Sequence, residues 1–318
     1  MQSSKPEHHL LCLGFGYTAQ FLAKRLLRPG ALIPFRRISG TTRGLNAKKA
    51  NSMASIGVKP IILEGDKANL IAAMSDLTHL LVSAAPPRNL NLEGDPNAEN
   101  ENKIICPALD IFQTLDTSSL KWIGYLSSNG VYGNHDGAWV DETTPPKPTG
   151  ARGRARLAAE KAWQTFGATK NIPVRIFRLP GIYGPGRSAL DSLRNGTAKR
   201  IHKPDQVFSR MHVDDIAMAL EKALFLNPTE DIFNLCDDEP SAPQDVIAYA
   251  AQLIGLDPPP IIDIEQAGLS EMGRSFYNDN KRVRNGLMKT ALELELQYPS
   301  YREGLQAIFS NETKSNPQ

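Results

Sequence analysis

The chain has 318 residues, of which 41% are hydrophobic and 22% are charged, so it is long enough for one large domain or two smaller ones and too apolar to be disordered. Its 36 Lys and Arg residues nearly balance its 34 Asp and Glu residues, which leaves no overall field to attract nucleic acid or an anionic membrane. We therefore expect a small-molecule partner rather than nucleic acid or a membrane.

The three cysteines, Cys12, Cys106 and Cys236, lie far apart and include no C-x-x-C pair. Their odd number and spacing argue against a disulfide framework and against a zinc site, so we expect no bound metal. The sequence shows neither a signal-peptide pattern nor an 18-residue apolar stretch, which favours a cytoplasmic location.

Short apolar runs alternate with segments of helical periodicity through the first half of the chain. The runs at residues 9–14, 36–43, 59–66, 79–86, 121–128 and 173–180 predict strands, and the segments at 19–27, 68–76, 108–115 and 157–166 predict helices. Strands that are apolar throughout and separated by helices are typical of a parallel sheet covered on both faces. The pattern predicts an α/β fold, a doubly wound parallel sheet of the Rossmann type.

Loops and helices predominate from Gly181 onward, with one more strand predicted at residues 231–238 and a helix at 243–256. We expect a dinucleotide-binding domain at residues 1–182 plus about 207–238 and a smaller substrate lobe at 183–206 plus about 239–308. Residues 309–318 are polar and are expected to form a flexible tail.

Gly14, Gly16 and Ala19 form a G-x-G-x-x-A array between the first predicted strand and the first predicted helix. In such an array the first glycine permits a tight turn, the second lets the backbone approach a pyrophosphate, and the small third residue lets helix and strand pack closely. A glycine turn that binds nothing is the alternative. The expected cofactor contacts in this segment are Gly14, Phe15, Gly16, Tyr17 and Thr18.

The second predicted strand ends without the carboxylate that normally binds an adenosine ribose, and Arg43 stands there instead. A guanidinium pairs bidentately with a 2′-phosphate, and the hydroxyls of Thr41 and Thr42 can also donate, so NADP is preferred over NAD. In the alternative, Arg43 is a solvated strand-end residue. Asp66 is suited to accept from an adenine amino group, although it could equally cap the following helix.

Four later segments carry a resemblance to a known family: "YLSSNGVYG", "WVDETTPPKP", "FRLPGIYGPGR" and "RMHVDDIAMAL". In this order they resemble the motifs of extended short-chain dehydrogenase/reductases, the nucleotide-sugar epimerase/dehydratase group. "FNLCDDEP", "RSFYNDNKRV" and "YPSYREGL" look like the tail of an atypical bacterial subgroup of largely unassigned function. The resemblance covers nearly the whole chain and implies a two-helix dimer interface, so a homodimer is expected. Ala84, Ala85 and Pro180 complete the expected cofactor-binding set.

The resemblance implies that Ser128 hydrogen-bonds the reacting oxygen of a substrate, because it stands three residues before the Val131-Tyr132-Gly133 triplet. In the alternative, its hydroxyl closes a turn at the end of the strand. The family's Tyr-x-x-x-Lys pair would follow on the next helix. When that helix is aligned on Glu160, Arg152 stands at the tyrosine position and Arg156 at the lysine position.

Arginine keeps its proton at working pH and therefore cannot replace the tyrosine as a general acid or base. Arg156 could still reach a ribose or a phosphate, and Arg152 could bind an anionic substrate group or stabilise an oxyanion. The two positions are four residues apart on one helical face, where like charges repel, which hints at an anion between them. Arg154 is expected on a solvated face. Ser128, Arg152 and Arg156 form the expected catalytic set.

No other tyrosine clearly takes over. Tyr277 and Lys281 match Tyr-x-x-x-Lys as a string, but they lie far beyond the expected helix and are predicted, with Arg187 of the "GPGR" segment, to line the substrate cleft. His212 is expected to be a buried structural histidine.

Two functions remain open. The first is an NADP-dependent oxidoreductase or epimerase-like enzyme for a small anionic carbonyl or sugar-type substrate, working without the usual tyrosine proton donor. The second is a catalytically silent NADP(H)-binding sensor or scaffold that kept the dinucleotide cleft and lost the proton shuttle. The substrate lobe favours the enzyme, partly by analogy of fold.

Overall fold

The computed structural model describes residues 8–42, 47–62, 71–72, 74, 76–86, 109–114 and 116–315. Contacts divide the chain into two compact units. Unit 1 comprises Met1–Ser127, Arg154–Phe177 and Ala217–Phe233, and unit 2 comprises Ser128–Gly153, Arg178–Ile216 and Asn234–Gln318. The sequence placed residues 128–153, 178–182, 207–216 and 234–238 in the first domain, whereas the contacts assign them to unit 2.

A seven-stranded sheet forms the centre of the α/β fold, in the order β11-β7-β5-β4-β1-β2-β3. The pairs β1–β2, β2–β3, β1–β4 and β4–β5 are parallel. This order, in which β1 lies between β4 and β2, is that of doubly wound nucleotide-binding domains. The strands are β1 (His8–Leu13), β2 (Phe35–Thr42), β3 (Val58–Ile62), β4 (His79–Val82), β5 (Trp122–Ser128), β7 (Val174–Leu179) and β11 (Ile232–Asn234).

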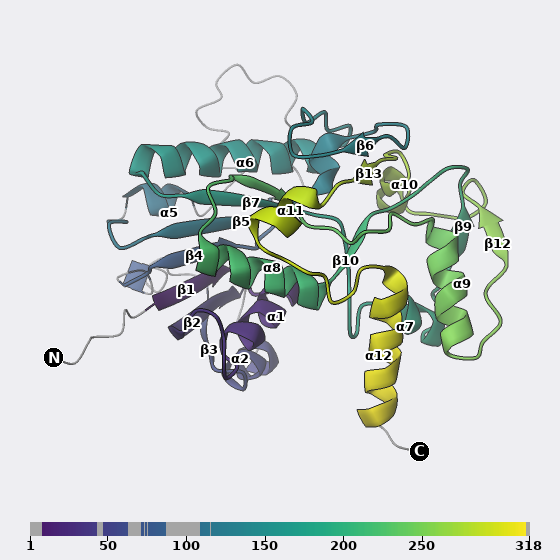
Figure 1. Ribbon diagram of the computed structural model, residues 1–318, viewed down its shortest axis with the longest axis horizontal. Coiled ribbons are helices and arrows are strands. Elements are labelled where there is room, and N and C mark those ends of the chain that lie inside the picture. The colour runs from purple at the N-terminus through teal and green to yellow at the C-terminus, as the bar shows by residue number, and fades with distance from the viewer. Residues whose placement is uncertain are drawn as a thin grey trace. The chain divides into compact units, whose positions relative to one another are not determined.

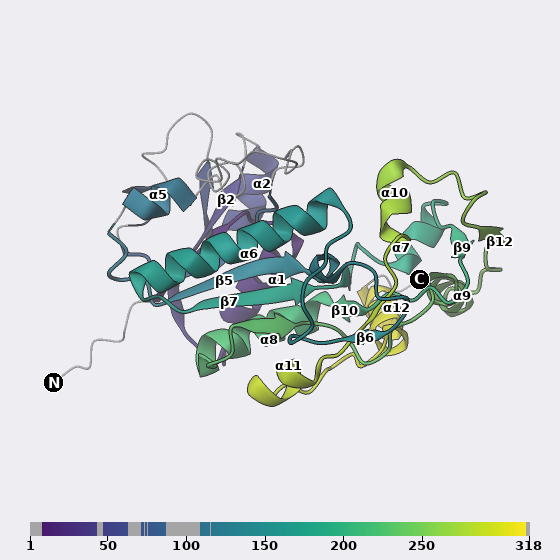
Figure 2. The ribbon, with the colours of Figure 1, turned by 90° about the horizontal axis from the view of Figure 1, so that it is seen from above.

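Helices cover both faces of this sheet, as the apolar strands predict (Figure 1). On one face, α5 (Leu109–Thr114) and α6 (Ala151–Lys170) pack on side chains of β1, β4, β5 and β7, and α6 runs along β5 and β7 (Figure 2). On the other face lie α1 (Tyr17–Leu26) and α8 (Val213–Leu226). The buried carboxylate of Glu221 on α8 joins these two helices through Arg25, at 2.5 Å. The remaining described helix of unit 1 is α2 (Ala47–Ala54).

Helix α6 buries one stripe of its surface, which explains why this segment folds as a helix. Ala155, Ala159, Ala162, Trp163 and Phe166 are buried at helical spacing, and the ring of Trp163 lies edge to face with Phe112 of α5. Apolar packing therefore holds α6 against the sheet, and the polar side chains of its first turn take no part in that packing.

Unit 2 is made of short elements and three small parallel sheets, β10–β8, β12–β9 and β13–β6. Its apolar cluster joins Tyr183 to Leu190, Val246, Tyr301 and Leu305. The strands are β6 (Trp139–Val140), β8 (Gly181–Tyr183), β9 (Arg200–His202), β10 (Arg210–His212), β12 (Ile261–Asp263) and β13 (Arg282–Val283). The helices are a 3-10 turn (Asn129–Tyr132), α7 (Ala189–Arg194), α9 (Pro243–Leu253), α10 (Glu271–Phe276), α11 (Gly286–Ala291) and α12 (Tyr301–Ser315).

The predicted fold class is confirmed, and each of the seven predicted strand segments overlaps a strand of the main sheet. The chain's end differs from the expectation, because α12 continues to Ser315 where a flexible tail was expected from residue 309. Apolar contacts of Ile308 and Phe309 and an ion pair of 2.7 Å between Glu312 and Arg194 hold this last part of the helix.

Candidate functional site

The turn between β1 and α1 requires glycine at its first position. Gly14 has φ +87°, and a Cβ built there would lie 2.8 Å from the backbone nitrogen of Ala84. Its N–H donates to Oγ1 of Thr41 at 2.6 Å, and the N–H of Phe15 donates to the Thr41 carbonyl at 3.0 Å. Phe15 is only 1% exposed and its N–H is already bonded, so its expected contact with the cofactor stays a prediction.

Gly16 is open where Gly14 is crowded. It is exposed and forms the N-cap of α1, and a Cβ there would meet no heavy atom within 4 Å. No side chain caps α1, and its first turn, which begins at Tyr17 and Thr18, holds no acidic residue. Ala19 is fully buried and lets α1 lie close to the sheet. An uncapped helix N-terminus with open space before it fits the pyrophosphate of a dinucleotide.

The groups expected around this turn are only partly described. Ala84 lies beside the turn, because its N–H donates to the Leu13 carbonyl at 2.8 Å, and Ala85 follows it. Thr42 is the last residue of β2 and is buried, and Pro180 connects β7 to β8. Arg43 and Asp66 lie outside the described residues, so their expected contacts with NADP stay predictions.

Ser128 ends β5 and closes the turn that follows it. Its Oγ accepts from the N–H of Gly130 at 3.1 Å, as the turn-closing alternative predicts. This bond uses the oxygen as an acceptor and leaves the hydroxyl proton available to donate. Ser128 can therefore close the turn and still donate to a substrate oxygen.

Arg156 turns onto β5. Its guanidinium donates to the Leu126 carbonyl at 2.6 Å and to the Tyr125 hydroxyl at 3.2 Å. The helix is also tied to this strand by Ser127, whose hydroxyl donates to the buried carboxylate of Glu160 at 2.5 Å. The sequence suggested that Arg156 could bind an anionic group such as a phosphate. In the structure its charge-assisted hydrogen bond goes instead to the carbonyl of Leu126 on β5.

Arg152 is exposed in the first turn of α6, and Arg154 is partly buried. Gly153 lies between them, where a Cβ would come 2.6 Å from the carbonyl oxygen of Gly130. The two arginines at the family's tyrosine and lysine positions therefore differ in their surroundings: one is exposed to solvent and the other is bonded to the backbone. Their catalytic roles stay predictions.

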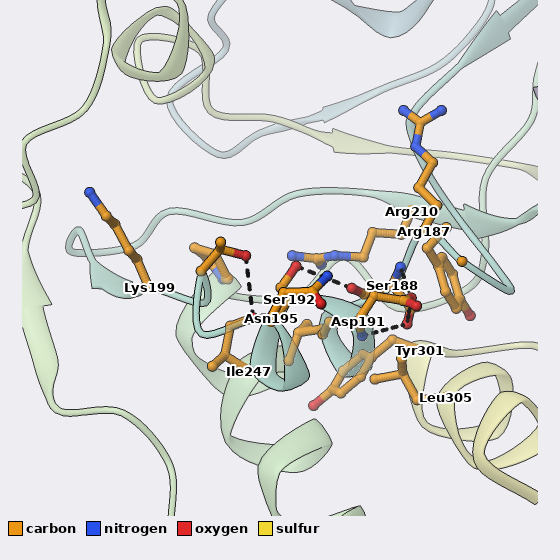
Figure 3. A pocket seen from close by; sticks show the side chains of 16 residues that line it. Arg187, Ser188, Asp191, Ser192, Asn195, Lys199, Arg210, Ile247, Tyr301 and Leu305 are labelled. Carbon is orange, nitrogen blue, oxygen red and sulfur yellow. Dashed lines mark hydrogen bonds between the residues drawn. The ribbon is translucent and has the colours of Figure 1, made fainter. Parts of the chain in front are cut away.

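Unit 2 contains a cavity of about 470 Å³ lined by three cationic side chains, Arg187, Lys199 and Arg210. In Figure 3, Lys199 lies at one end of the lining group, and Arg187 and Arg210 lie toward the other. Arg210 donates to the carbonyls of Phe208 and Ser241 at 2.9 and 3.1 Å, which anchors one side of its guanidinium. Such a cavity suits an anionic ligand.

The floor of this cavity is the start of α7. Ser188 and Asp191 form a capping box, in which the Ser188 N–H donates to Asp191 Oδ2 at 2.8 Å and the Asp191 N–H donates to Ser188 Oγ at 3.3 Å. Arg187 was predicted as a substrate residue, whereas the sequence reasoning missed Arg210 and Lys199. Arg210 begins the "RMHVDD" segment, in which the sequence pattern singles out only His212.

The other two predicted substrate residues are not among those that line this cavity. Lys281 is buried and donates to the Gly133 carbonyl at 2.7 Å, so it fixes the loop after the 3-10 turn. Burial lowers the pKa of its ammonium group, and Asp279 opposes that shift. Tyr277 packs its ring against Phe208.

His212 is buried as expected, and its Nδ1 accepts from the backbone N–H of Asp214 at 3.2 Å. Burial lowers its pKa to about 4, so the ring stays neutral near pH 7.

Within the described part of the chain, no group of three or more His, Cys, Asp or Glu side chains could hold a metal ion. None of the described helices has both the length and the apolar character of a membrane span.

Comparison with known proteins gives a family and a set of similar structures. Residues 13–236 match the model of the NAD dependent epimerase/dehydratase family. A functionally unknown conserved protein from Silicibacter pomeroyi is 44% identical, with a TM-score of 0.80 over 96% of this chain and 99% of that one. Protein YeeZ of Escherichia coli K12 is 30% identical over 179 residues, which span 55% of this chain and 58% of YeeZ.

More distant structures share the fold. UDP-glucuronic acid 4-epimerase from Bacillus cereus, in complex with UDP-glucuronic acid and NAD, is 17% identical, with a TM-score of 0.71 over 97% of this chain and all of that one. dTDP-glucose 4,6-dehydratase from Bacillus anthracis, in complex with NAD, is 16% identical, with a TM-score of 0.73 over 97% of both chains.

Proposed function

Because the chain belongs to the NAD dependent epimerase/dehydratase family, we propose that it is an NADP-dependent oxidoreductase that acts on a small anionic carbonyl or sugar-type compound. The observation that carries this proposal is the pairing of an open glycine turn in unit 1 with a cation-lined cavity in unit 2. The first suits the pyrophosphate of a dinucleotide, and the second suits the negative charge of a substrate.

The choice of NADP over NAD rests on the sequence at the end of β2. No carboxylate stands there to accept from the ribose hydroxyls, and Arg43 can pair with a 2′-phosphate. In a fluorescence titration we expect NADPH to bind more tightly than NADH and Arg43→Ala to erase the difference. Equal affinities of the unchanged protein for the two would refute this choice.

The reaction would have to proceed without the family's proton shuttle. Bound NADP would supply the hydride chemistry. Ser128 would donate a hydrogen bond to a substrate carbonyl, because its own oxygen already accepts from the N–H of Gly130. Arg152 would hold negative charge on the substrate but cannot release a proton, so the transferred proton would come from water or from another acid. Because Arg152 and Arg156 stand where the family has its catalytic tyrosine and lysine, the chain would belong to an atypical subgroup of the family.

A label-transfer experiment tests the activity. The purified protein is incubated with 4R- or 4S-deuterated NADPH and a panel of anionic aldehydes, ketones and sugar nucleotides, and products are analysed by mass spectrometry. We expect deuterium in at least one product and none with Ser128→Ala. Binding of NADPH with no transfer to any compound would favour the second candidate function.

That second candidate is a catalytically silent NADP(H)-binding sensor or scaffold. It is favoured by Arg156, whose hydrogen bonds to the Leu126 carbonyl and to Tyr125 give it a structural role where the family has a catalytic lysine. A sensor would change its shape or its partners with the redox state of the cofactor. Different proteolysis patterns with NADP and NADPH, together with no label transfer, would support it.

A further inference from the structure

A buried carboxyl group adjoins the cation-lined cavity of unit 2. Asp237 follows β11 and is only 1% exposed, and neither of its carboxyl oxygens has a hydrogen-bond partner of ordinary geometry among the described residues. Its backbone N–H donates to the carbonyl of Arg210 at 2.7 Å. Arg210 lines the cavity, so Asp237 is one backbone hydrogen bond away from a residue of its lining.

The groups around Asp237 make this carboxyl easier to protonate than an ordinary one. Burial raises the pKa of Asp237 to about 8, although Arg210 and the N–H groups of Arg210 and Glu239 oppose that shift. The neighbouring Asp238 raises it further. The charged and titratable groups around Asp237 and its immediate neighbours come from several elements. They are Arg210 on β10, Tyr183 on β8, Asp215 on α8, Lys289 on α11, Tyr301 and Glu303 on α12, Glu142 after β6, Tyr277 after α10, and Cys236, Asp238 and Glu239 beside it in the chain.

Several of these neighbours keep one charge state between pH 7 and 9. Burial raises the pKa values of the Tyr183 and Tyr301 hydroxyls and of the Cys236 thiol, so all three stay neutral. Arg210 stays protonated. Asp237, with a pKa of about 8, changes its charge within this interval.

We propose that Asp237 couples anion binding in this cavity to the uptake of a proton. The inference rests on the proposed function, in which the cavity holds the anionic part of the substrate. An anion at Arg210 repels an ionised Asp237, and a protonated Asp237 leaves the full charge of Arg210 to the anion. The cavity therefore binds dianions more tightly when Asp237 is neutral, although Asp237 itself does not line it.

The test uses inorganic sulfate, whose charge is constant between pH 7 and 9. Calorimetric titrations of the full chain are made at fixed ionic strength, in two buffers with different heats of ionisation at each pH. We expect sulfate affinity to fall roughly three- to tenfold from pH 7 to pH 9. Near pH 8 the buffer comparison should show uptake of about 0.3 to 0.5 proton per bound sulfate.

Two amide variants locate the proton. Asp237→Asn imitates the neutral acid, so it should bind sulfate equally at both pH values and take up no proton. Asp238→Asn is the matched control, because Asp238 is the next residue and its carboxylate is exposed and bonded to Lys289 at 2.6 Å. This control should keep a pH-dependent affinity and the proton uptake, with the midpoint moved to lower pH because Asp238 raises the pKa of Asp237.

Three results would overturn the proposal: equal affinity of the unchanged protein at pH 7 and 9, no binding of sulfate at either pH, or a wild-type pH dependence in Asp237→Asn. The buffer comparison needs no variant, so an absence of proton uptake near pH 8 also overturns the proposal, even if Asp237→Asn fails to fold. A parallel titration with NADPH reports on the proposed function separately, since it concerns the glycine turn of unit 1.

Discussion

The turn after β1 and the cavity of unit 2 offer different groups to a charged ligand: the turn offers backbone N–H groups, and the cavity offers cationic side chains. The turn relies on backbone N–H groups, on a left-handed glycine and on small residues above a buried core. The cavity relies on the side chains of Arg187, Lys199 and Arg210. Lys199 donates to the Ala267 carbonyl and Arg210 to the Phe208 carbonyl. Binding by backbone tolerates few substitutions and responds little to pH, whereas binding by side chains can be tuned by neighbouring charges.

The largest expected effect comes from filling the crowded position of the turn. Gly14→Val would place side-chain atoms against the backbone of Ala84 and would put a branched residue at φ +87°. We expect a loss of about 2–5 kcal/mol in the free energy of unfolding, measured by urea denaturation. Gly30→Val is the control, because Gly30 has φ +77° and open space around it. If Gly30→Val lost as much free energy of unfolding as Gly14→Val, crowding against Ala84 would contribute nothing to the loss, and the positive φ alone would explain it.

Gly16→Val separates binding from stability in the same turn. No atom lies within 4 Å of a Cβ at Gly16, and its φ of −96° suits any residue, so the free energy of unfolding should change by less than about 0.5 kcal/mol. The new side chain would stand where the pyrophosphate must approach, and NADPH affinity should fall about 100-fold. Undiminished affinity would place the dinucleotide elsewhere.

Acid should destabilise the sheet of unit 1 through His79. This side chain is buried on β4, and burial together with His8 and Lys121 lowers its pKa to about 3. The unfolded chain protonates this ring below about pH 6.5 and the folded chain does not, so stability is present above pH 6.5 and is lost as pH falls toward 3. Between pH 6.5 and 5 the loss should be about 2 kcal/mol.

His79→Phe should remove that part of the pH dependence, because phenylalanine does not titrate and Phe35 and Trp122 already surround the site with aromatic rings. Urea denaturation at pH 6.5 and 5 measures the difference. His135→Phe is the control, because His135 lies in unit 2 and is only partly buried. Equal acid sensitivity of His79→Phe and the unchanged protein would contradict the assignment.

The smallest expected effect distinguishes the two arginines of α6. Arg156→Met leaves the Leu126 carbonyl without its donor and should cost about 1–3 kcal/mol of stability. Arg152→Met removes an exposed side chain and should change stability by less than about 0.5 kcal/mol. Thermal unfolding of the two variants makes the comparison. The opposite order would mean that the exposed arginine, not the strand-bonded one, supports the fold.

The sequence predicted those features that depend on local pattern. Continuous apolar runs such as residues 79–86 identified the strands, and Gly14, Gly16 and Ala19 identified the turn, because only small residues fit there. The contacts of Arg156 were not predictable, because they depend on the register of α6 against β5. Its two acceptors lie thirty or more residues away in the chain.

The cavity of unit 2 was the least predictable part. Its cations come from three separate segments, so no local spacing marks Arg187, Lys199 and Arg210 as neighbours. Asp237 also gave no signal, because "FNLCDDEP" contains two adjacent aspartates and only the fold buries the first of them. Tertiary packing therefore decides which charged residues form a site.

Calorimetric titration with NADPH and with NADH at pH 7 tests the central claim most directly, namely that unit 1 binds a phosphorylated dinucleotide at the Gly14–Gly16 turn. We expect saturable heat with both compounds, tighter binding of NADPH, and loss of the signal in Gly16→Val. No heat at millimolar concentrations of either the reduced or the oxidised cofactors would contradict the claim.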